Sequence, residues 1–228
     1  MKNDYKLYSF DKISSTQSYA IEMIARGVAR DKIVIMAAAQ SAGRGRGAHK
    51  WVSHHGNLYA SFIYKSLTPD PRLSYAIAVA LAETLIKFGI PARIKWPNDI
   101  FADGKKIAGV LIEYVDNFVV AGIGLNINTN PTLRGNYLST KTDNYQKLTR
   151  EELLSELMIQ LDFWRAKLKL KNFNIIRKRW TSLAIGINSK ITYRGQNYIL
   201  RGINESGGLV LGTFGTENIS VLDNEILI

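Results

Sequence analysis

A short segment rich in glycine and arginine holds the densest group of chemically useful residues in the chain. Residues 40–51 read Gln-Ser-Ala-Gly-Arg-Gly-Arg-Gly-Ala-His-Lys-Trp. Glycines let backbone N–H groups approach an anion, and the forked donors of Arg44 and Arg46 match carboxylate and phosphate groups. The segment predicts an anion-binding loop, with a mobile basic surface loop as the alternative.

A second candidate is the corner Lys95-Trp96-Pro97-Asn98-Asp99. Its proline ends a strand and stiffens the backbone, so the polar side chains project from a rigid turn. An amide next to a carboxylate suits Mg²⁺ or nucleotide hydroxyls, although a plain Asn-Asp turn explains the same residues.

A third candidate is Lys106, which begins an otherwise apolar strand. Strict alternation places Ala108, Val110 and Ile112 on its face, so its ammonium is expected at the rim of an apolar pocket. The neighbouring Lys105 is interpreted as a solvated edge charge.

Several common catalytic arrangements are missing. The chain has no cysteine, and His49, His54 and His55 lack the spacing of a helical zinc site. There is no G-x-S-x-G elbow and no Walker A motif, which disfavours a nucleophilic hydrolase and a P-loop enzyme. The glycine loop fits the dinucleotide pattern G-x-G-x-x-A, but residues 50–57 predict no helix to receive a pyrophosphate.

The hydrophobic pattern predicts the elements that position these residues. Strands are expected over residues 5–10, 32–39, 57–65, 92–96, 100–102, 106–115 and 118–128, with residues 57–65 alternating between two faces. Helices are expected from Thr16 to Gly27, over 74–88, after a capping box at Thr149 and Glu152, and around Phe173–Trp180. Hairpin turns are expected at Asp103-Gly104 and Asp116-Asn117.

After Gly186 the pattern changes to short strands, typical of a small all-β module. Because hairpins and helices are mixed, we predict an α+β fold with a mixed sheet and packed helices. We place a catalytic domain at residues 1–183 and a C-terminal β domain at residues 184–228.

Composition and charge restrict the class of protein. With 46% hydrophobic and 21% charged residues, the 228-residue chain is typical of a soluble globular protein and not of a disordered one. No signal peptide or membrane span is indicated, so a cytoplasmic location without a membrane partner is expected. The net charge is +11, and residues 163–204 contain no Asp or Glu, which raises nucleic acid as a partner.

The sequence resembles the biotin protein ligases, also called biotin–[biotin carboxyl carrier protein] ligases. The motifs, in the order and near the spacing of that family, are Gly43-Arg44-Gly45-Arg46 with Trp51, Lys95-Trp96-Pro97-Asn98-Asp99, Lys106-Ile107-Ala108-Gly109 and Gly124-Leu125-Asn126. The resemblance covers residues 5–183 and, more loosely, the C-terminal module. It implies a class II synthetase-like catalytic domain followed by an SH3-like β-barrel.

The resemblance also implies roles for individual residues. The implied catalytic residues are Arg46, Lys106 and Arg44. The implied biotin site consists of Ser15, Thr16, Gln40, Gly43, Arg44, Arg46, Lys106, Gly109 and Leu111. The implied nucleotide contacts come from Arg44, Lys95, Trp51, Asn98, Asp99 and Asn126, with Asp99 as the Mg²⁺ ligand. Trp51 is equally well interpreted as a core residue.

The implied reaction has two steps: biotin and MgATP give biotinyl-5′-AMP and pyrophosphate, and a lysine then takes the biotinyl group. The implied partners are biotin, ATP and a biotin carboxyl carrier protein domain of a biotin-dependent carboxylase. A homodimer is expected only at the level of the family.

Two departures and two alternatives accompany the resemblance. After Arg46 the loop reads Gly-Ala-His, where many relatives have further arginines. The Ser15-Thr16 motif begins almost at once, so we expect a monofunctional ligase without an N-terminal DNA-binding domain and without a specific DNA partner. The alternatives are a lipoate ligase-like acyl-adenylating enzyme and a nucleic-acid-binding module that uses the basic segment Lys167–Arg179. That segment is otherwise a solvated helix face or a surface that steers an acidic carrier domain.

Overall fold

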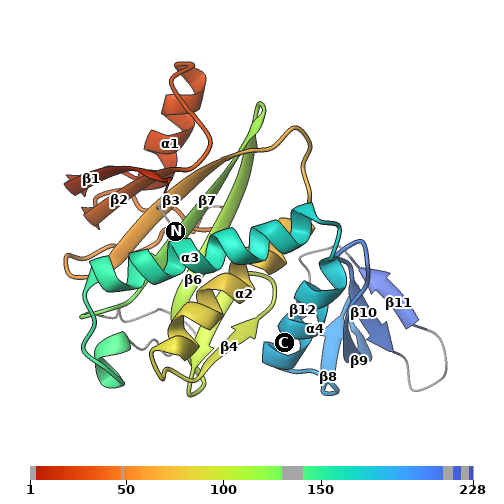
Figure 1. Ribbon diagram of the computed structural model, residues 1–228. Helices are drawn as coiled ribbons and strands as arrows, with labels where there is room; N and C mark the ends of the chain where they lie inside the picture. The colour runs from red at the N-terminus through yellow and green to blue at the C-terminus, as the bar shows by residue number, and fades with distance from the viewer. Residues whose placement is uncertain (1–3, 48, 130–140, 213–217, 222–225, 228) are drawn as a thin grey trace.

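The computed structural model describes residues 4–47, 49–129, 141–212, 218–221 and 226–227, which form two β-sheets and a layer of helices (Figure 1). The larger sheet has seven strands in the order β1-β2-β3-β7-β6-β5-β4. They are β1 (Lys6–Ile13), β2 (Ile33–Gln40), β3 (Leu58–Lys65), β4 (Ala92–Lys95), β5 (Asp99–Ala102), β6 (Lys105–Val115) and β7 (Phe118–Leu125). β1 pairs with β2 in parallel and the other neighbours are antiparallel, which confirms the predicted mixed sheet.

Helices pack against the two faces of this sheet unequally (Figure 1). On one face lie α2 (Arg72–Lys87), α3 (Arg150–Lys169) and α4 (Phe173–Leu183), and on the other lies α1 (Thr16–Ala25). A 3₁₀ turn, η1 (Thr142–Asn144), precedes α3. Of the helices in the described ranges, none is long and apolar enough to cross a bilayer.

The register of the strands decides which residues face each helix layer. Val34 of β2 is opposite Phe62 of β3, and both lie in the large core with α2. Ile33 is opposite Ile63, and both pack against α1. β3 is therefore buried on both faces along residues 58–64, which corrects the predicted alternation: two helix layers cover it.

The C-terminal residues form the predicted small β module. Its strands are β8 (Lys190–Tyr193), β9 (Gln196–Ile203), β10 (Leu209–Gly212), β11 (Asn218–Val221) and β12 (Ile226–Leu227), in the order β11-β10-β9-β8-β12. The described residues include no pairing between β11 and β12. An SH3-like barrel and a domain boundary after residue 183 stay predictions.

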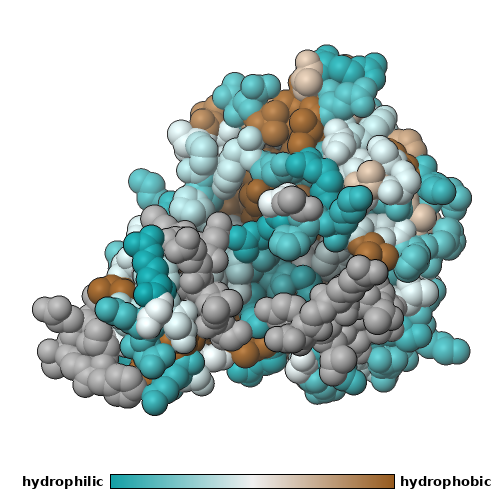
Figure 2. Space-filling model, turned by 180° about the vertical axis from the view of Figure 1, so that it is seen from behind, coloured by the Kyte–Doolittle hydropathy of each residue, from teal (hydrophilic) through white to brown (hydrophobic). Residues whose placement is uncertain are grey.

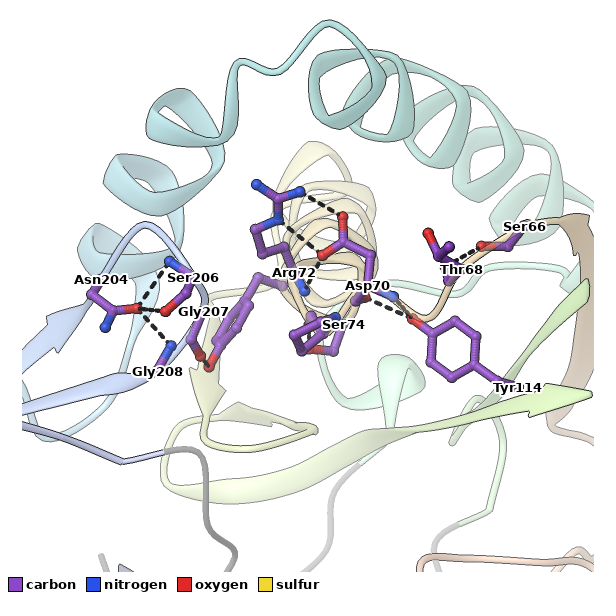
Figure 3. A network of polar contacts seen from close by, with 12 residues as sticks. Ser66, Thr68, Asp70, Arg72, Ser74, Tyr114, Asn204, Ser206, Gly207 and Gly208 are labelled. Carbon is purple, nitrogen blue, oxygen red and sulfur yellow. Dashed lines mark hydrogen bonds and ion pairs between the residues drawn. The ribbon is translucent and has the colours of Figure 1, made fainter.

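The β9–β10 turn packs against the start of α2 (Figure 3). The buried hydroxyl of Tyr75 donates a hydrogen bond of 2.6 Å to the carbonyl of Gly207, a turn residue with φ +89°. Trp96 Nε1 donates to the same hydroxyl at 3.4 Å. One phenol thus connects the second sheet with the Lys95–Asp99 corner.

The predicted elements are confirmed with small shifts at their ends. α2 begins at Arg72 rather than at residue 74, because the Asp70 carboxylate accepts the N–H of Arg72 at 2.9 Å. The predicted capping box is present: the Glu152 N–H donates to Thr149 Oγ1, and the Glu152 carboxylate accepts the N–H of Thr149.

We expect Thr149→Ala to lower the free energy of unfolding by about 1 kcal/mol, because an N-cap hydrogen bond of α3 is lost. Urea unfolding followed by circular dichroism measures this change. The control is Ser155→Ala at an exposed position of the same helix, which should be neutral or slightly stabilising.

The effect of Thr149→Ala on the free energy of unfolding should depend on pH. Hydrogen bonds from the backbone and hydroxyl of Thr149 hold the pKa of Glu152 below its ordinary 4.5. A carboxyl group with a lowered folded pKa stabilises the protein above its ordinary pKa and loses that contribution as the pH falls through the folded pKa. The difference between wild type and Thr149→Ala should therefore shrink below pH 4.5. A difference that grows there would contradict this interpretation.

Candidate active site

A cavity of about 490 Å³ lies on the sheet face that α2 does not cover. Seen from the side opposite α2 and α3, the surface is largely hydrophilic, with small hydrophobic areas between polar residues (Figure 2). The predicted residues that line the cavity are Ser15, Thr16, Gln40, Arg44, Arg46, Trp51, Lys95, Asn98, Asp99, Lys106, Gly109, Leu111 and Asn126. The fold therefore brings together residues from segments far apart in the sequence, and their roles remain predictions.

The arginine loop folds back on itself beside the cavity. Gly45 N–H donates to the His49 carbonyl at 2.8 Å, and Trp51 N–H donates to the Gly43 carbonyl at 2.9 Å. Gly43 does not line the cavity. Its backbone lies so close to residue 51 that a Cβ at this position would be 2.3 Å from the Trp51 carbonyl oxygen. No helix begins among the described residues of 41–57, so the dinucleotide-binding alternative lacks its anion site.

Each of three cations at the cavity has an oxygen acceptor. Lys106 Nζ lies 2.7 Å from Asp99 Oδ1. Arg46 Nη1 donates to Asn98 Oδ1 at 3.2 Å, and the Asn98 amide donates to the Val110 carbonyl at 2.5 Å. The third pair, Arg44 with Glu113, has a separation of 2.7 Å. These contacts hold the positive groups at fixed positions around one space.

The ammonium of Lys106 lies on the opposite sheet face from the one that strict alternation predicts. The pairing of β5 with β6 shifts register between Ile100 and Phe101, which makes Ile107 an extra, bulged residue of β6. Beyond a bulge the alternation is inverted, so Lys106 points into the cavity and not into the core under α2. The predicted companions Ala108, Val110 and Ile112 pack in that core, although Val110 also contributes to the cavity lining. Gly109 and Leu111 alternate with them and line the cavity.

The indole of Trp51 lies against the sheet at two paired glycines. Gly109 of β6 is opposite Gly124 of β7, and a Cβ at these positions would lie 2.8 Å and 2.5 Å from indole atoms. Lys106 Nζ is 5.2 Å from the centroid of the Trp51 ring. The buried Nε1 atom has no hydrogen-bond partner among the described residues, which leaves one donor at the cavity wall. Trp51 therefore lines the cavity and is only half-buried, and its role in the site stays a prediction.

Polar side chains form the floor beside α1. Thr16 donates to Gln40 Oε1 from its N–H at 2.8 Å and from its hydroxyl at 3.2 Å, and Gln40 Nε2 donates to Ser53 Oγ at 2.9 Å. Ser15 Oγ accepts the N–H of Ser18, so this hydroxyl is also the N-cap of α1.

Three further polar residues belong to this site although no motif predicts them. Gln17 and Ser61 line the cavity, and Glu113 forms an ion pair with the cavity residue Arg44. Gln17 directly follows the predicted Ser15-Thr16 pair, and this adjacency is its only sequence signal. Ser61 and Glu113 lie on strands, where the pairing and register decide which residues are neighbours. The sequence therefore contains no signal that assigns either residue to the site.

The residues predicted to contact a nucleotide also line the cavity. Asn126, 2% exposed, donates its N–H to the bulged Ile107 carbonyl at 3.0 Å. The Lys95 ammonium is 5.6 Å from the Phe101 ring centroid. Burial raises the pKa of Tyr59 at the cavity wall to about 12, and its hydroxyl donates to the His54 carbonyl at 2.8 Å.

Two arginines of segment 163–204, which contains no Asp or Glu, form contacts within the fold. Arg165, 7% exposed, stacks 3.3 Å above the Tyr64 ring centroid, and Arg179 forms an ion pair with Glu83 of α2. These two charges are not free for a partner. The nucleic-acid alternative therefore has fewer available cations than the net charge suggests.

Known proteins match this chain over most of its length. The model of the biotin/lipoate A/B protein ligase family matches residues 9–130. The chain belongs to this family. A family member, the bifunctional ligase/repressor BirA of Bacillus subtilis (strain 168), is 31% identical over 222 residues, covering 89% of this chain and 68% of that protein. The biotin--[acetyl-CoA-carboxylase] ligase of Paracoccus denitrificans is 30% identical over 198 residues, covering 78% of this chain and 82% of that protein.

A solved structure extends the likeness to nearly the full length of the chain. The biotin protein ligase from Aquifex aeolicus in complex with biotin and ATP has a TM-score of 0.85 and 26% identity. The match covers 97% of each chain. The resemblance to biotin protein ligases stated from the sequence is thereby confirmed.

For this family member we expect Gly124→Ala to displace the Trp51 indole, because the added methyl would lie 2.5 Å from its ring. Such overpacking costs typically about 1–3 kcal/mol. The measurement is urea unfolding together with tryptophan fluorescence, whose emission should move to longer wavelength as the indole meets water.

Trp51→Phe supplies the control for this experiment. In that background, Gly124→Ala should leave the emission of the remaining tryptophans unchanged. The assignment would be wrong if the same emission shift appeared without the Trp51 indole.

Proposed function

We propose that this chain activates biotin with ATP as biotinyl-5′-AMP and transfers the biotinyl group to a lysine of a biotin carboxyl carrier protein. The observation that carries the proposal is the meeting of Arg46 and Lys106 in one cavity of a chain from this family. The names of the Paracoccus and Aquifex relatives support biotin and ATP as substrates, and the first supports an acceptor in a biotin-dependent carboxylase.

The first step joins two anions, so its main obstacle is electrostatic. A carboxylate and an α-phosphate 4 Å apart repel by about 4 kcal/mol at an effective dielectric constant of 20. The carboxylate oxygen of biotin attacks the α-phosphorus, and pyrophosphate leaves with the bonding electrons. Arg46 and Lys106 lower this barrier by holding positive charge at the reacting groups, and Arg44 orders the loop over the product.

The biotin site of this proposal combines a polar floor with an apolar wall. The ureido ring of biotin presents two N–H donors and one carbonyl acceptor. The hydroxyl and amide groups of Ser15, Thr16 and Gln40 match these donors and acceptors. Gly109 and Leu111 form the wall, and Gly43 gives the loop the close turn that brings its arginines to the carboxylate.

The nucleotide site of this proposal uses Lys95, Trp51 and Asn126 together with the Asn98-Asp99 corner. Asp99 is the carboxylate at the cavity, and the described residues contain no cluster of three or more metal-binding side chains. Mg²⁺ is typically held by one or two carboxylates plus substrate phosphates. This donor set fits a Mg²⁺ that arrives with ATP, because Lys106 pairs with Oδ1 of Asp99 and the carboxylate has a second oxygen, Oδ2. When bound, the ion would neutralise part of the phosphate charge.

The second step needs little chemistry from the protein. The mixed anhydride is already activated, so the neutral amine of the acceptor lysine attacks the biotinyl carbonyl. AMP leaves with the electrons of the broken C–O bond, and the nitrogen loses a proton. The cavity mainly positions the amine against the anhydride, which by itself supplies a large part of the rate.

We expect Lys106→Ala and Arg46→Ala each to reduce biotin-dependent pyrophosphate release by about 10²–10³-fold, the usual effect of losing one charge-stabilising donor. The matched control is Lys105→Ala, which removes an exposed ammonium from the adjacent position of the same strand and should leave the rate unchanged. Equal rates in wild type, Lys106→Ala and Lys105→Ala would refute the role of Lys106.

The reaction itself is tested by incubating the chain with biotin, MgATP and a purified carrier domain. Mass spectrometry should show that one lysine of the carrier gains a biotinyl group. Lipoate in place of biotin is the control, because the family also includes lipoate ligases. Modification by lipoate and not by biotin would replace the proposal with the lipoate alternative.

A further inference from the structure

Glu113 on β6 connects the arginine loop to the buried floor of the cavity. Its Oε1 atom accepts a hydrogen bond from Arg44 Nη2 at 2.7 Å, and its Oε2 atom accepts one from Gln17 Nε2 at 2.9 Å. The side chain of Glu113 is 27% exposed and that of Arg44 is 38% exposed, so water screens the pair only in part. One carboxylate thus holds a loop cation with one oxygen and a buried amide with the other.

The orientation of the Gln17 amide is fixed by its surroundings. Nε2 faces two acceptors, Glu113 Oε2 and the Val120 carbonyl at 3.3 Å, whereas Oε1 faces the Ser61 hydroxyl at 3.0 Å. A flipped amide would place its oxygen against both acceptors. The lack of a side chain at Gly122 leaves room for the Gln17 amide, because a Cβ there would lie 2.5 Å from Gln17 Oε1.

From Gln17 a chain of hydrogen bonds runs beneath the cavity and returns to the loop. Its links join Gln17 to Ser61 (3.0 Å), Ser61 to Thr16 (2.9 Å), Thr16 to Gln40 (2.8 Å), Gln40 to Ser53 (2.9 Å) and Ser53 to the Trp51 carbonyl (2.9 Å). With the Arg44 link, both ends of the chain lie in one loop, which the floor therefore holds at two points.

We propose that Glu113 is a positioning residue that fixes the Arg44 loop to this polar floor, so that the position of the loop depends on what the floor binds. The inference rests on the proposed function, because Thr16 and Gln40 are the residues proposed to hold the ureido ring. A ligand that forms hydrogen bonds with Thr16 and Gln40 therefore contacts a chain of hydrogen bonds that ends at Arg44 in the loop. A simple exposed ion pair would not have this effect, because it would contribute little to stability and would not be connected to the floor.

The test is Glu113→Gln, which keeps the shape of the side chain and removes its charge. In the ligand-free protein we expect trypsin to cleave after Arg46 and Lys50 about tenfold faster than in wild type, because a hydrogen bond between charged groups is lost. The matched control is Glu22→Gln, which removes the exposed partner of Arg26 and leaves the cleavage rate unchanged.

A second readout separates positioning from general stability. With biotin and MgATP but no carrier, Glu113→Gln should release biotinyl-5′-AMP into solution about tenfold faster, since the loop that covers it is loosened. Loss of stability alone would lower the melting temperature without changing this release. In an Arg44→Gln background, Glu113→Gln should change neither readout, because its partner is gone.

Unchanged cleavage in Glu113→Gln, or an equal acceleration in the Arg44→Gln background, would overturn the inference. Proteolysis needs no substrate, so absence of biotin transfer by wild type would refute the proposed function separately. If circular dichroism shows that Glu113→Gln is unfolded, Arg44→Gln tests the same pair from the loop side. Unchanged cleavage after Lys50 in that variant would then overturn the inference.

Discussion

Each of three cations around one cavity is held by its own oxygen acceptor. The pairs are Lys106 with Asp99, Arg46 with Asn98, and Arg44 with Glu113. Two of these acceptors are anions, whereas the Asn98 amide is neutral, so Arg46 keeps the least compensated charge. An incoming carboxylate or phosphate is therefore attracted most strongly there, while the other cations are positioned without being left unpaired in a half-buried space. The remaining architecture keeps these pairs in place.

Three glycines of the sheet make room for the side chains of Trp51 and Gln17 at the cavity. Gly109, Gly122 and Gly124 lie on the cavity side of two paired strands, and a Cβ at any of them would collide with Trp51 or Gln17. These larger side chains occupy the space instead and bring an indole and an amide onto the sheet. A helix layer on the opposite face buries the same strands, so a packed core supports this wall of the cavity.

The Lys95–Asp99 corner is supported from outside the larger sheet. Trp96, which lines the cavity, contacts the hydroxyl of Tyr75, and that hydroxyl bonds the Gly207 carbonyl in the β9–β10 turn. The second sheet is therefore connected to Trp96 in the wall of the cavity through a buried phenol, and residues of both sheets share one apolar core. This contact explains why a turn far away in the sequence lies against the start of α2 (Figure 3).

The sequence by itself determined the elements, because apolar periodicity, the Thr149 cap and the Asp103-Gly104 turn act over a few residues. It also predicted the motif residues that line the cavity. Only the tertiary structure decided the direction of Lys106, since the bulge at Ile107 depends on pairing with β5 and inverts the alternation. It alone placed Glu113 against the loop, because contacts between distant strands follow from register, which no local pattern in the sequence records.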